Sequence, residues 1–188
     1  MSVTTIDPRC ALVVIDLQEG IVSVLSGHPT ADAVKQAAHL AAGYRRHGLP
    51  VVLVNVIASA PGRTEAGRGG GGGSLPDGWA DLIGDLDVQA TDHLITKRRR
   101  SAFHDTGLDT LLRDLGVTQV VLAGISTSAG VESTARSAHD YGYHVVLATD
   151  AMTDRDDVAH RHSTERVFPK LGETDTTANI LDMLEATR

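Results

Sequence analysis

The chain has 188 residues, 41% of them hydrophobic and 22% charged, which fits one globular domain and is too short for two full enzymatic domains. Its 17 Lys and Arg against 24 Asp and Glu give a formal net charge of -7, which repels nucleic-acid phosphates and anionic membrane surfaces. One Trp, three Tyr and two Phe cannot form a stacking platform for unpaired bases, so we expect a small molecule or another protein as partner, with no nucleic acid and no membrane.

The N-terminal residues contain no apolar stretch followed by a small-residue cleavage site, and no apolar run approaches the ~20 residues of a membrane span. We therefore expect a cytoplasmic protein. The single cysteine, Cys10, cannot form an internal disulfide. It stands directly before an apolar run, where cysteine usually behaves as a small buried hydrophobe.

Short runs rich in Val, Leu and Ile are the strand signal of this chain. Four strong runs and a weaker fifth occur, at Ala11–Ile15, Val51–Ile57, Val117–Ala123, His144–Ala148 and, more weakly, His93–Thr96. They lack the alternation of a strand with one solvated face. Such runs favour strands that are buried on both faces of a parallel sheet.

Segments with helical spacing lie between these runs. The clearest, Ala31–His47, has Thr30 as its expected N-cap and Gly48 just past its end. The other helices are predicted at Leu108–Leu115, which we expect to pack on the sheet, and at Gly130–Tyr141, Asp156–Phe168 and Thr176–Glu185. The alternation predicts an α/β fold, a three-layer α/β/α sandwich with a Rossmann-like parallel sheet, in a single domain over residues 1–188.

Residues 58–76 interrupt the pattern with two prolines and five consecutive glycines. Because both flanks belong to the same domain pattern, we expect a Gly-rich loop that forms a mobile flap beside the strand ends. A phosphate cradle is the alternative interpretation. It would need Gly-Lys-Ser/Thr leading into a helix, whereas these glycines run into Ser74, Leu75 and Pro76.

Polar residues follow two of the apolar runs directly. In open α/β sheets the ligand binds outside the carboxyl ends of the strands. Asp16 follows the first run, so it is either a half-buried functional carboxylate or a cap for what comes next. Lys97 follows the weaker run and precedes Arg98–Arg100, so it either points into the same crevice as Asp16 or belongs to a solvated basic face.

The run that ends at Gly124 leads through a turn of small residues into a predicted helix. The first N–H groups of a helix lack partners and can hold an oxyanion or a carboxylate. Ser126, Thr127 and Ser128 can equally cap the helix, and the two roles are compatible.

Four segments together carry a resemblance to a known family. The segments ALVVIDLQ, ITKRRRSAF, VLAGISTSAGVESTARSAHDYGYHV and ATDAMTD are similar, in this order and spacing, to the isochorismatase-like hydrolases, also called cysteine hydrolases. The resemblance covers about residues 9–184. It implies the isochorismatase-like hydrolase fold, with a parallel sheet of about six strands, and an enzyme whose aspartate, lysine and cysteine meet at the strand ends.

The resemblance assigns the family's catalytic aspartate to Asp16 and its lysine to Lys97, but its cysteine position falls on Gly130. Amidase members attack a carbonyl with the thiolate and form a covalent intermediate, a route that glycine closes. Ser126 and Ser128 stand four and two residues from that position. The true isochorismatases, which this chain resembles in having glycine there, cleave an enol ether without a covalent step.

Enol-ether hydrolysis needs an acid that protonates a carbon, after which water captures the oxocarbenium ion. We expect Asp16 to be this acid, Lys97 its charged partner, and the N–H groups around Gly130 an anion cradle. A nearby lysine favours the ionised carboxylate, whereas an acid must hold its proton. The hypothesis therefore requires desolvation that raises the pKa of Asp16.

The resemblance also implies which residues bind the substrate and which cofactors are absent. Gln18, Ile125, Ser126 and Ala129 are the expected substrate-binding residues, with a cis peptide bond between Ile125 and Ser126. No cofactor is expected. Nicotinamidase-type members carry an Asp-x-His metal cluster after the second strand, but residues 55–79 contain no histidine, so we predict no zinc site.

The nine histidines are scattered along the chain. His160 and His162 are close in sequence but point to different sides of a helix, and we expect all nine to be surface residues.

Two functions remain open. The first is cofactor-free acid/base hydrolysis of a small acidic metabolite, either an enol ether such as isochorismate or a related ester or amide. The second is a catalytically inactive family member that acts as a binding or scaffold subunit, since the cysteine is missing. Retention of both Asp16 and Lys97 opposes the second, because a buried charge pair is costly to keep for stability alone. The resemblance further implies a homo-oligomer, a dimer or larger.

Overall fold

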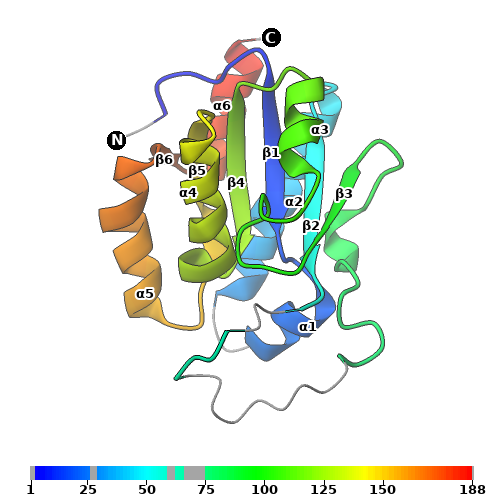
Figure 1. Ribbon diagram of the computed structural model, residues 1–188. Coiled ribbons are helices and arrows are strands. Elements are labelled where there is room, and N and C mark those ends of the chain that lie inside the picture. Colours follow the sequence, from blue (N-terminus) through cyan, green and yellow to red (C-terminus); the bar gives the residue numbers. More distant parts are fainter. Residues whose placement is uncertain (1–2, 26–28, 59–61, 66–74, 188) are drawn as a thin grey trace.

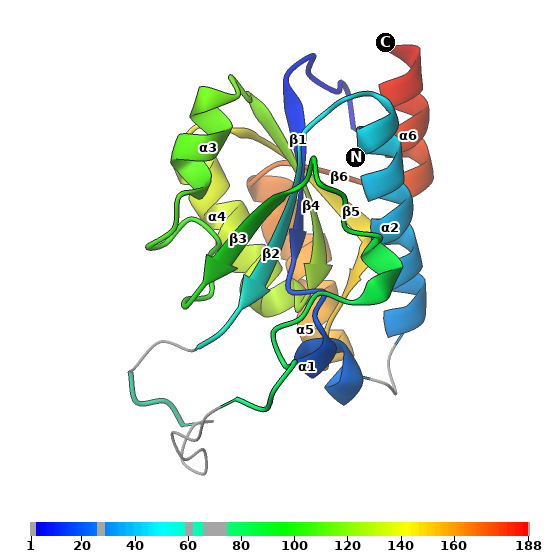
Figure 2. The same ribbon diagram turned by 90° about the vertical axis from the view of Figure 1, so that its right-hand side faces the viewer.

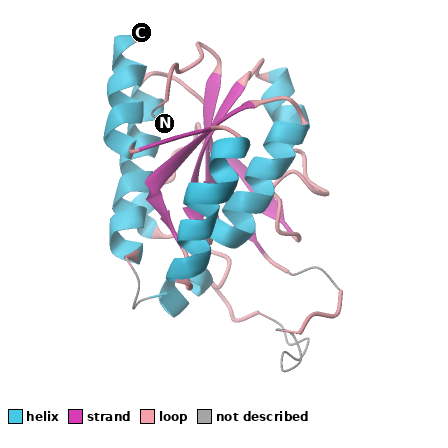
Figure 3. Ribbon diagram, turned by 90° about the vertical axis from the view of Figure 1, so that its left-hand side faces the viewer, coloured by secondary structure: helices cyan, strands magenta, loops and turns pink. Residues whose placement is uncertain are grey.

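The computed structural model of the protein describes residues 3–25, 29–58, 62–65 and 75–187. A six-stranded sheet runs through it in the order β3-β2-β1-β4-β5-β6, and every neighbouring pair is parallel. Figure 3 shows this sheet between two layers of helices. The predicted three-layer α/β/α sandwich with a Rossmann-like sheet is therefore confirmed. Much of the predicted flap, at residues 59–61 and 66–74, lies outside the described residues.

The strands are β1 Cys10–Ile15, β2 Val51–Val56, β3 His93–Lys97, β4 Gln119–Ile125, β5 His144–Thr153 and β6 Glu173–Asp175. The central strands β1 and β4 are buried along their whole length, as their continuous apolar runs predict. The same expectation is wrong for β3, which forms an edge of the sheet and leaves Leu94 63% exposed. Strand β6 has no apolar run, so the sequence pattern does not reveal it.

The helices are α1 Glu19–Val22, α2 Thr30–Arg46, α3 Leu108–Asp114, α4 Glu132–Asp140, α5 Asp157–His162 and α6 Thr177–Ala186. Helices α2 and α6 cover one face of the sheet, and α3 and α4 cover the other (Figure 2). Helix α5 lies beside α4 (Figure 1). Within the described residues no helix combines the length and the apolar character that a membrane span requires.

Alternate residues of β1 supply the two hydrophobic cores. Leu12 and Val14 belong to the core that α2 and α6 cover. Val13 and Ile15 belong to the core on the α3 and α4 side. Because side chains alternate along a strand, Ile15 points toward the layer that contains α3 and α4.

Helices α2 and α3 differ from their predictions in details at one end. Thr30 does not cap α2, because it is the first helical residue and its hydroxyl donates to the carbonyl oxygen of Leu25 at 2.8 Å. Gly48, with a φ of 63°, does end this helix as expected. Helix α3 packs on the sheet through Leu108 and Leu112, as predicted, although Leu115 is 41% exposed.

Of the three helices predicted in the C-terminal half, the last is found as α6 and the other two contain π turns. The segment predicted as a helix from Gly130 instead begins with a π turn at residues 127–131, and α4 follows it. The segment predicted as Asp156–Phe168 divides into α5, a π turn at 163–167 and a 3-10 turn at 168–170, where Pro169 lacks the N–H that a helix would need. Periodic spacing does not distinguish a π turn from an α-helix.

Candidate active site

The candidate site lies where the order of strands reverses. From β1 the chain proceeds through β2 to β3 at one edge, whereas β4 lies on the other side of β1 and leads to β5 and β6. The connections that follow β1 and β4 run in opposite directions from the carboxyl ends of these strands, and in such folds a crevice forms between them. Asp16 directly follows β1, the π turn 127–131 follows β4, and Lys97 is the last residue of β3.

The backbones of β1 and β4 approach closely at this end. Gly124 pairs with Ile15 and has a φ of 117°, and a Cβ atom there would fall on the Ile15 backbone. Only glycine fits this position. The peptide bond between Ile125 and Ser126 is cis, the geometry that the family resemblance implies. Asp16 has a φ of 53°, a conformation in which aspartate is enriched over most other residues.

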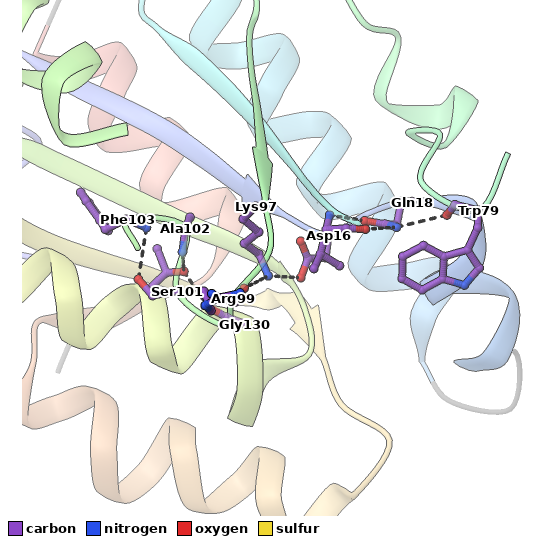
Figure 4. A network of polar contacts seen from close by, with 11 residues as sticks. Asp16, Gln18, Trp79, Lys97, Arg99, Ser101, Ala102, Phe103 and Gly130 are labelled. Carbon is purple, nitrogen blue, oxygen red and sulfur yellow. Dashed lines mark hydrogen bonds and ion pairs between the residues drawn. The ribbon is translucent and has the colours of Figure 1, made fainter. Parts of the chain in front are cut away.

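The structure brings Asp16 and Lys97 into a buried ion pair. Lys97 Nζ lies 2.8 Å from Asp16 Oδ2, and the two side chains are only 2% and 7% exposed. Lys97 Nζ also donates to the carbonyl oxygen of Arg99 at 3.1 Å (Figure 4). Lys97 is therefore not part of a solvated basic face. The second carboxylate oxygen, Asp16 Oδ1, is buried and has no hydrogen-bond partner among the described residues.

Burial decides the protonation of Asp16. Desolvation raises the pKa of this carboxyl to about 6, against the attraction and the hydrogen bond of Lys97, which both lower it. A carboxyl with such a pKa holds its proton in about half of the molecules at pH 6 and in about a tenth of them at pH 7. The shift has the direction that an acid at this position requires.

Gly130 lies directly against this carboxylate (Figure 4). A Cβ atom built on Gly130 would stand 3.1 Å from Asp16 Oδ2 and 2.9 Å from Ile15 Cγ2, both closer than ordinary van der Waals contact. Its φ does not lie in the left-handed region, so limited space, rather than backbone conformation, favours glycine here. Position 130 therefore faces Asp16 with little space for a side chain.

The amide of Gln18 is already occupied by the protein backbone. Its Nε2 donates to the carbonyl oxygens of Val56 and Trp79, each at 3.1 Å, and its Oε1 accepts the Val56 N–H at 2.7 Å (Figure 4). The side chain is fully buried. We therefore interpret Gln18 as a positioning residue that joins the end of β2 to the segment around Trp79, instead of a substrate ligand.

The turn after β4 offers fewer donors to an anion than the sequence suggested. The N–H groups of Ala129 and Val131 donate to the Ser126 carbonyl oxygen, at 3.1 and 3.2 Å. The N–H and the hydroxyl of Ser128 both donate to Asp154 Oδ2, at 2.7 and 2.8 Å. These groups hold the turn together, which limits any anion cradle to the remaining backbone of this turn.

Three residues support this turn; the sequence did not single out Asp154, and it assigned other roles to Thr127 and His160. Asp154, at the end of β5, holds Ser128, and Thr127 Oγ1 lies 2.8 Å from His160 Nδ1 on α5. The expectation that every histidine is a surface residue is wrong for His160, which packs against the buried Thr127. Helical spacing could not reveal this contact, because it depends on how α5 is placed against the turn.

The two cavities we describe lie away from these residues. One, of about 520 Å³, lies at the amino ends of β4 and β5, and the other, of about 480 Å³, lies between α1 and the start of α2. Neither is lined by Asp16, Lys97 or Gly130. Among the described residues no group of three or more His, Cys, Asp or Glu side chains is arranged to hold a metal ion.

Comparisons with known proteins extend over almost the whole chain. A family model described as the isochorismatase domain matches residues 10–179. An isochorismatase family protein of Bacillus subtilis is 37% identical over 183 residues, which cover 94% of this chain and 95% of that protein. The maleamate amidohydrolase of Pseudomonas putida is 28% identical over 93% of this chain and 86% of its own length.

The fold is also similar to that of solved structures. An isochorismatase family protein from Burkholderia thailandensis matches with a TM-score of 0.89 and 36% identity, covering 98% of this chain and 100% of that one. Because the match covers nearly the whole of both chains, the arrangement of elements around the ends of β1 and β4 is shared with that protein.

Proposed function

The chain belongs to the isochorismatase family of hydrolases, and from this premise we propose that it hydrolyses an enol ether of a small acidic metabolite, such as isochorismate, by acid catalysis. Asp16 is the acid, Lys97 is its charged partner, and no cofactor or cysteine nucleophile takes part. One observation carries the proposal. The buried Asp16 carboxyl has a pKa raised to about 6, one of its oxygens has no hydrogen-bond partner among the described residues, and it faces a glycine.

The position of Gly130 supports a reaction without a thiolate. The family resemblance places the nucleophilic cysteine at this position, and a glycine there supplies no nucleophile. The chain's single cysteine, Cys10, begins β1, whereas Asp16 follows its end, so the strand separates them by roughly 20 Å. Covalent thiol catalysis at Asp16 would therefore need a group that this chain does not place there.

The proposed reaction uses the two oxygens of Asp16 differently. Lys97 holds Oδ2, and the protonated Oδ1 donates its proton to the terminal carbon of the enol ether, which leaves an oxocarbenium ion at the ether carbon. Water adds to that carbon and returns a proton to Asp16. The hemiketal then collapses, and its hydroxyl proton leaves with the alcohol as the keto acid forms. For isochorismate the keto acid is pyruvate.

Lys97 stabilises the state that follows proton transfer. When Asp16 loses its proton, a buried carboxylate remains, and the ammonium 2.8 Å away offsets its charge. The lysine thus limits how far burial raises the pKa of Asp16, and it stabilises the carboxylate that remains after proton transfer. An acid held too tightly protonated would transfer its proton less readily.

Amide hydrolysis is the second candidate, because a relative is a maleamate amidohydrolase. With glycine at position 130, Asp16 would then have to act as a base that activates water. Acid and base roles require opposite protonation states of one carboxyl. The two candidates therefore predict opposite dependence of the rate on pH.

The deciding experiment measures pyruvate release from isochorismate between pH 5 and 8, and ammonia release from maleamate in parallel. We expect pyruvate release whose kcat/KM falls as the pH rises above about 6, as Asp16 loses its proton. We expect Asp16→Asn to lower it by about 1,000-fold, within the range of general-acid catalysis. Ammonia release that rises with pH would support the amidase, and no turnover of either substrate would support the inactive subunit.

A further inference from the structure

The turn that carries Gly130 is held from outside by a histidine that the proposed reaction does not use. We propose that His160 is a positioning residue, which accepts the Thr127 hydroxyl hydrogen on its neutral ring and so fixes the turn that places Gly130 against Asp16. The inference rests on the proposed function for its kinetic consequences, but its structural part can be tested without substrate.

The contact has a definite direction. Thr127 is fully buried, and His160 Nδ1, 2.8 Å away, is the partner its hydroxyl has in the described part of the chain. A buried hydroxyl must place its hydrogen on an acceptor. The assignment that satisfies it makes Nδ1 the acceptor and puts the ring hydrogen on Nε2.

Protonation of His160 would break this arrangement. In the imidazolium both ring nitrogens are donors, so the Thr127 hydroxyl would lose its acceptor in a buried place. Asp154 continues to hold the neighbouring Ser128 through two hydrogen bonds. The turn would then be held at Ser128 and released at Thr127, three residues before Gly130.

The surroundings of His160 favour its neutral ring. Burial lowers the pKa of the ring, and the carboxylates of Asp154, just after β5, and Asp157, on α5, act against this shift. The π turn 127–131 faces the ring with the Thr127 hydroxyl, and in the turn after α5 the Thr164 hydroxyl donates to the His160 carbonyl oxygen. Glu165 and Arg166 in that same turn are exposed to solvent.

Small movements of the turn matter because its clearance is small. A Cβ atom at position 130 would already stand 3.1 Å from Asp16 Oδ2, so a shift of a few tenths of an ångström changes the space beside the acid. The Gly130 carbonyl oxygen also accepts the Thr134 hydroxyl at 2.7 Å, which ties the turn to α4. His160 and Thr134 thus hold opposite ends of the same turn.

The kinetic consequence is a bell-shaped pH profile in the wild-type protein. Its alkaline limb follows Asp16, and its acid limb follows His160, whose neutral form is required. His160→Asn keeps an acceptor near the position of Nδ1 but cannot titrate. We expect this variant to lose the acid limb and to keep kcat/KM within about 3-fold of the wild type at the optimum.

Variants without the hydrogen bond should behave alike. We expect His160→Leu and Thr127→Val each to lower kcat about 10-fold with little change in KM, and the double variant to be no worse than either single one, since both remove one interaction. His162→Asn, an exposed histidine on the same helix, is the matched control and should keep both limbs. An acid limb that persists in His160→Asn, or losses that multiply in the double variant, would overturn the inference.

A measurement without substrate separates this inference from the proposed function. In ¹H–¹⁵N spectra the Gly130 amide should shift with the titration of His160 in the wild type, and this shift should be absent in His160→Asn. If it is observed while isochorismate is not turned over, the proposed function fails and the positioning role stands. If Gly130 does not respond, the positioning role fails whatever the protein hydrolyses.

Discussion

Two aspartates in different regions of this protein are buried beside a cation, and they differ in what their oxygens contact. Asp92, whose side chain is 1% exposed, accepts Arg45 Nε on Oδ1 and Arg45 Nη2 on Oδ2, and the Gln89 N–H also donates to Oδ2. Asp16 receives Lys97 on Oδ2 and leaves Oδ1 without a partner among the described residues. The first pair fastens α2 to the segment before β3, whereas the second leaves Oδ1 of its carboxylate without a hydrogen bond among the described residues.

This difference separates a structural ion pair from a candidate catalytic one. Buried polar atoms in native proteins are nearly always hydrogen-bonded, so a carboxylate oxygen without a partner needs an explanation. The two cations also differ in kind. Arg45 binds both oxygens of Asp92 with its planar guanidinium, whereas the Lys97 ammonium contacts a single oxygen of Asp16.

Removal of Lys97 or of Arg45 should have the largest effects, and the two effects should differ. We expect Lys97→Met to lower the free energy of unfolding at pH 7 by about 3 kcal/mol, because the buried Asp16 carboxyl loses its cation and must either stay ionised without it or take up a proton. It should also move the alkaline limb of the pH profile upward, because Lys97 lowers the pKa of Asp16. Arg45→Met should lower stability without moving that limb. Urea denaturation and the pH dependence of kcat/KM measure the two effects.

The double variant Asp16→Asn/Lys97→Met tests the cause of the lost stability. When both charges are absent, no buried ion remains unpaired, so most of the stability lost in Lys97→Met should return. A double variant no more stable than Lys97→Met would mean that the lysine contributes through packing of its side chain, and the charge argument would fail.

Replacement of each aspartate by asparagine should change the pH dependence of stability differently. The pKa of Asp16 rises on folding from 3.8 to about 6, so the folded protein binds this proton more tightly than the unfolded chain does. The stability that this proton contributes is complete below pH 3.8 and is lost as the pH rises through about 6. Relative to the wild type, the stability of Asp16→Asn should therefore increase by up to about 3 kcal/mol between pH 4 and 7, on top of a loss at every pH because the buried Lys97 ammonium loses its partner.

Asp92→Asn supplies the matched comparison. It breaks the paired contacts with Arg45, and we expect a loss of about 2 kcal/mol at pH 7 with an unchanged profile of activity against pH. Chemical denaturation of both variants at several pH values gives the answer. If the stability difference between Asp16→Asn and the wild type does not change with pH, the raised pKa of Asp16 is contradicted.

The sequence predicted the layers, because continuous apolar runs indicate strands that are buried on both faces. Residues that follow parallel strands meet at one edge of the sheet, so a position of Lys97 beside Asp16 was one of two interpretations, and the family resemblance favoured it. Strand β6 was not visible because its three residues, Glu173–Asp175, are polar and form an edge. The identification of position 130 depended on family resemblance, since no spacing rule singles out one glycine.

What the sequence could not give is the state of each polar atom. The Gln18 amide is fully hydrogen-bonded to backbone groups, whereas Asp16 Oδ1 has no partner among the described residues. This difference depends on how β2, α1 and the segment near Trp79 are packed. The contact of His160 with Thr127 has the same origin, because it joins α5 to a π turn. Periodicity predicts that a residue is buried but not which atoms it meets there.

The smallest predicted effect concerns the glycine beside the acid. Gly130→Ala places a methyl group 3.1 Å from Asp16 Oδ2 and 2.9 Å from Ile15 Cγ2, so Ile15 or the turn must shift. We expect kcat/KM for isochorismate to fall about 10-fold, because the methyl group crowds the acid without removing it. Gly107→Ala is the matched control, since nothing lies within 4 Å of its added Cβ, and it should keep full activity.

A cysteine at the same position tests whether limited space explains the glycine. Gly130→Cys has the same Cβ as alanine, so we expect the same crowding and no gain of ammonia release from maleamate, because the added thiol cannot enter without displacing Asp16 or Ile15. A gain of amidase activity in Gly130→Cys would show that the turn moves freely enough to admit a side chain. In that case limited space would not explain glycine at position 130.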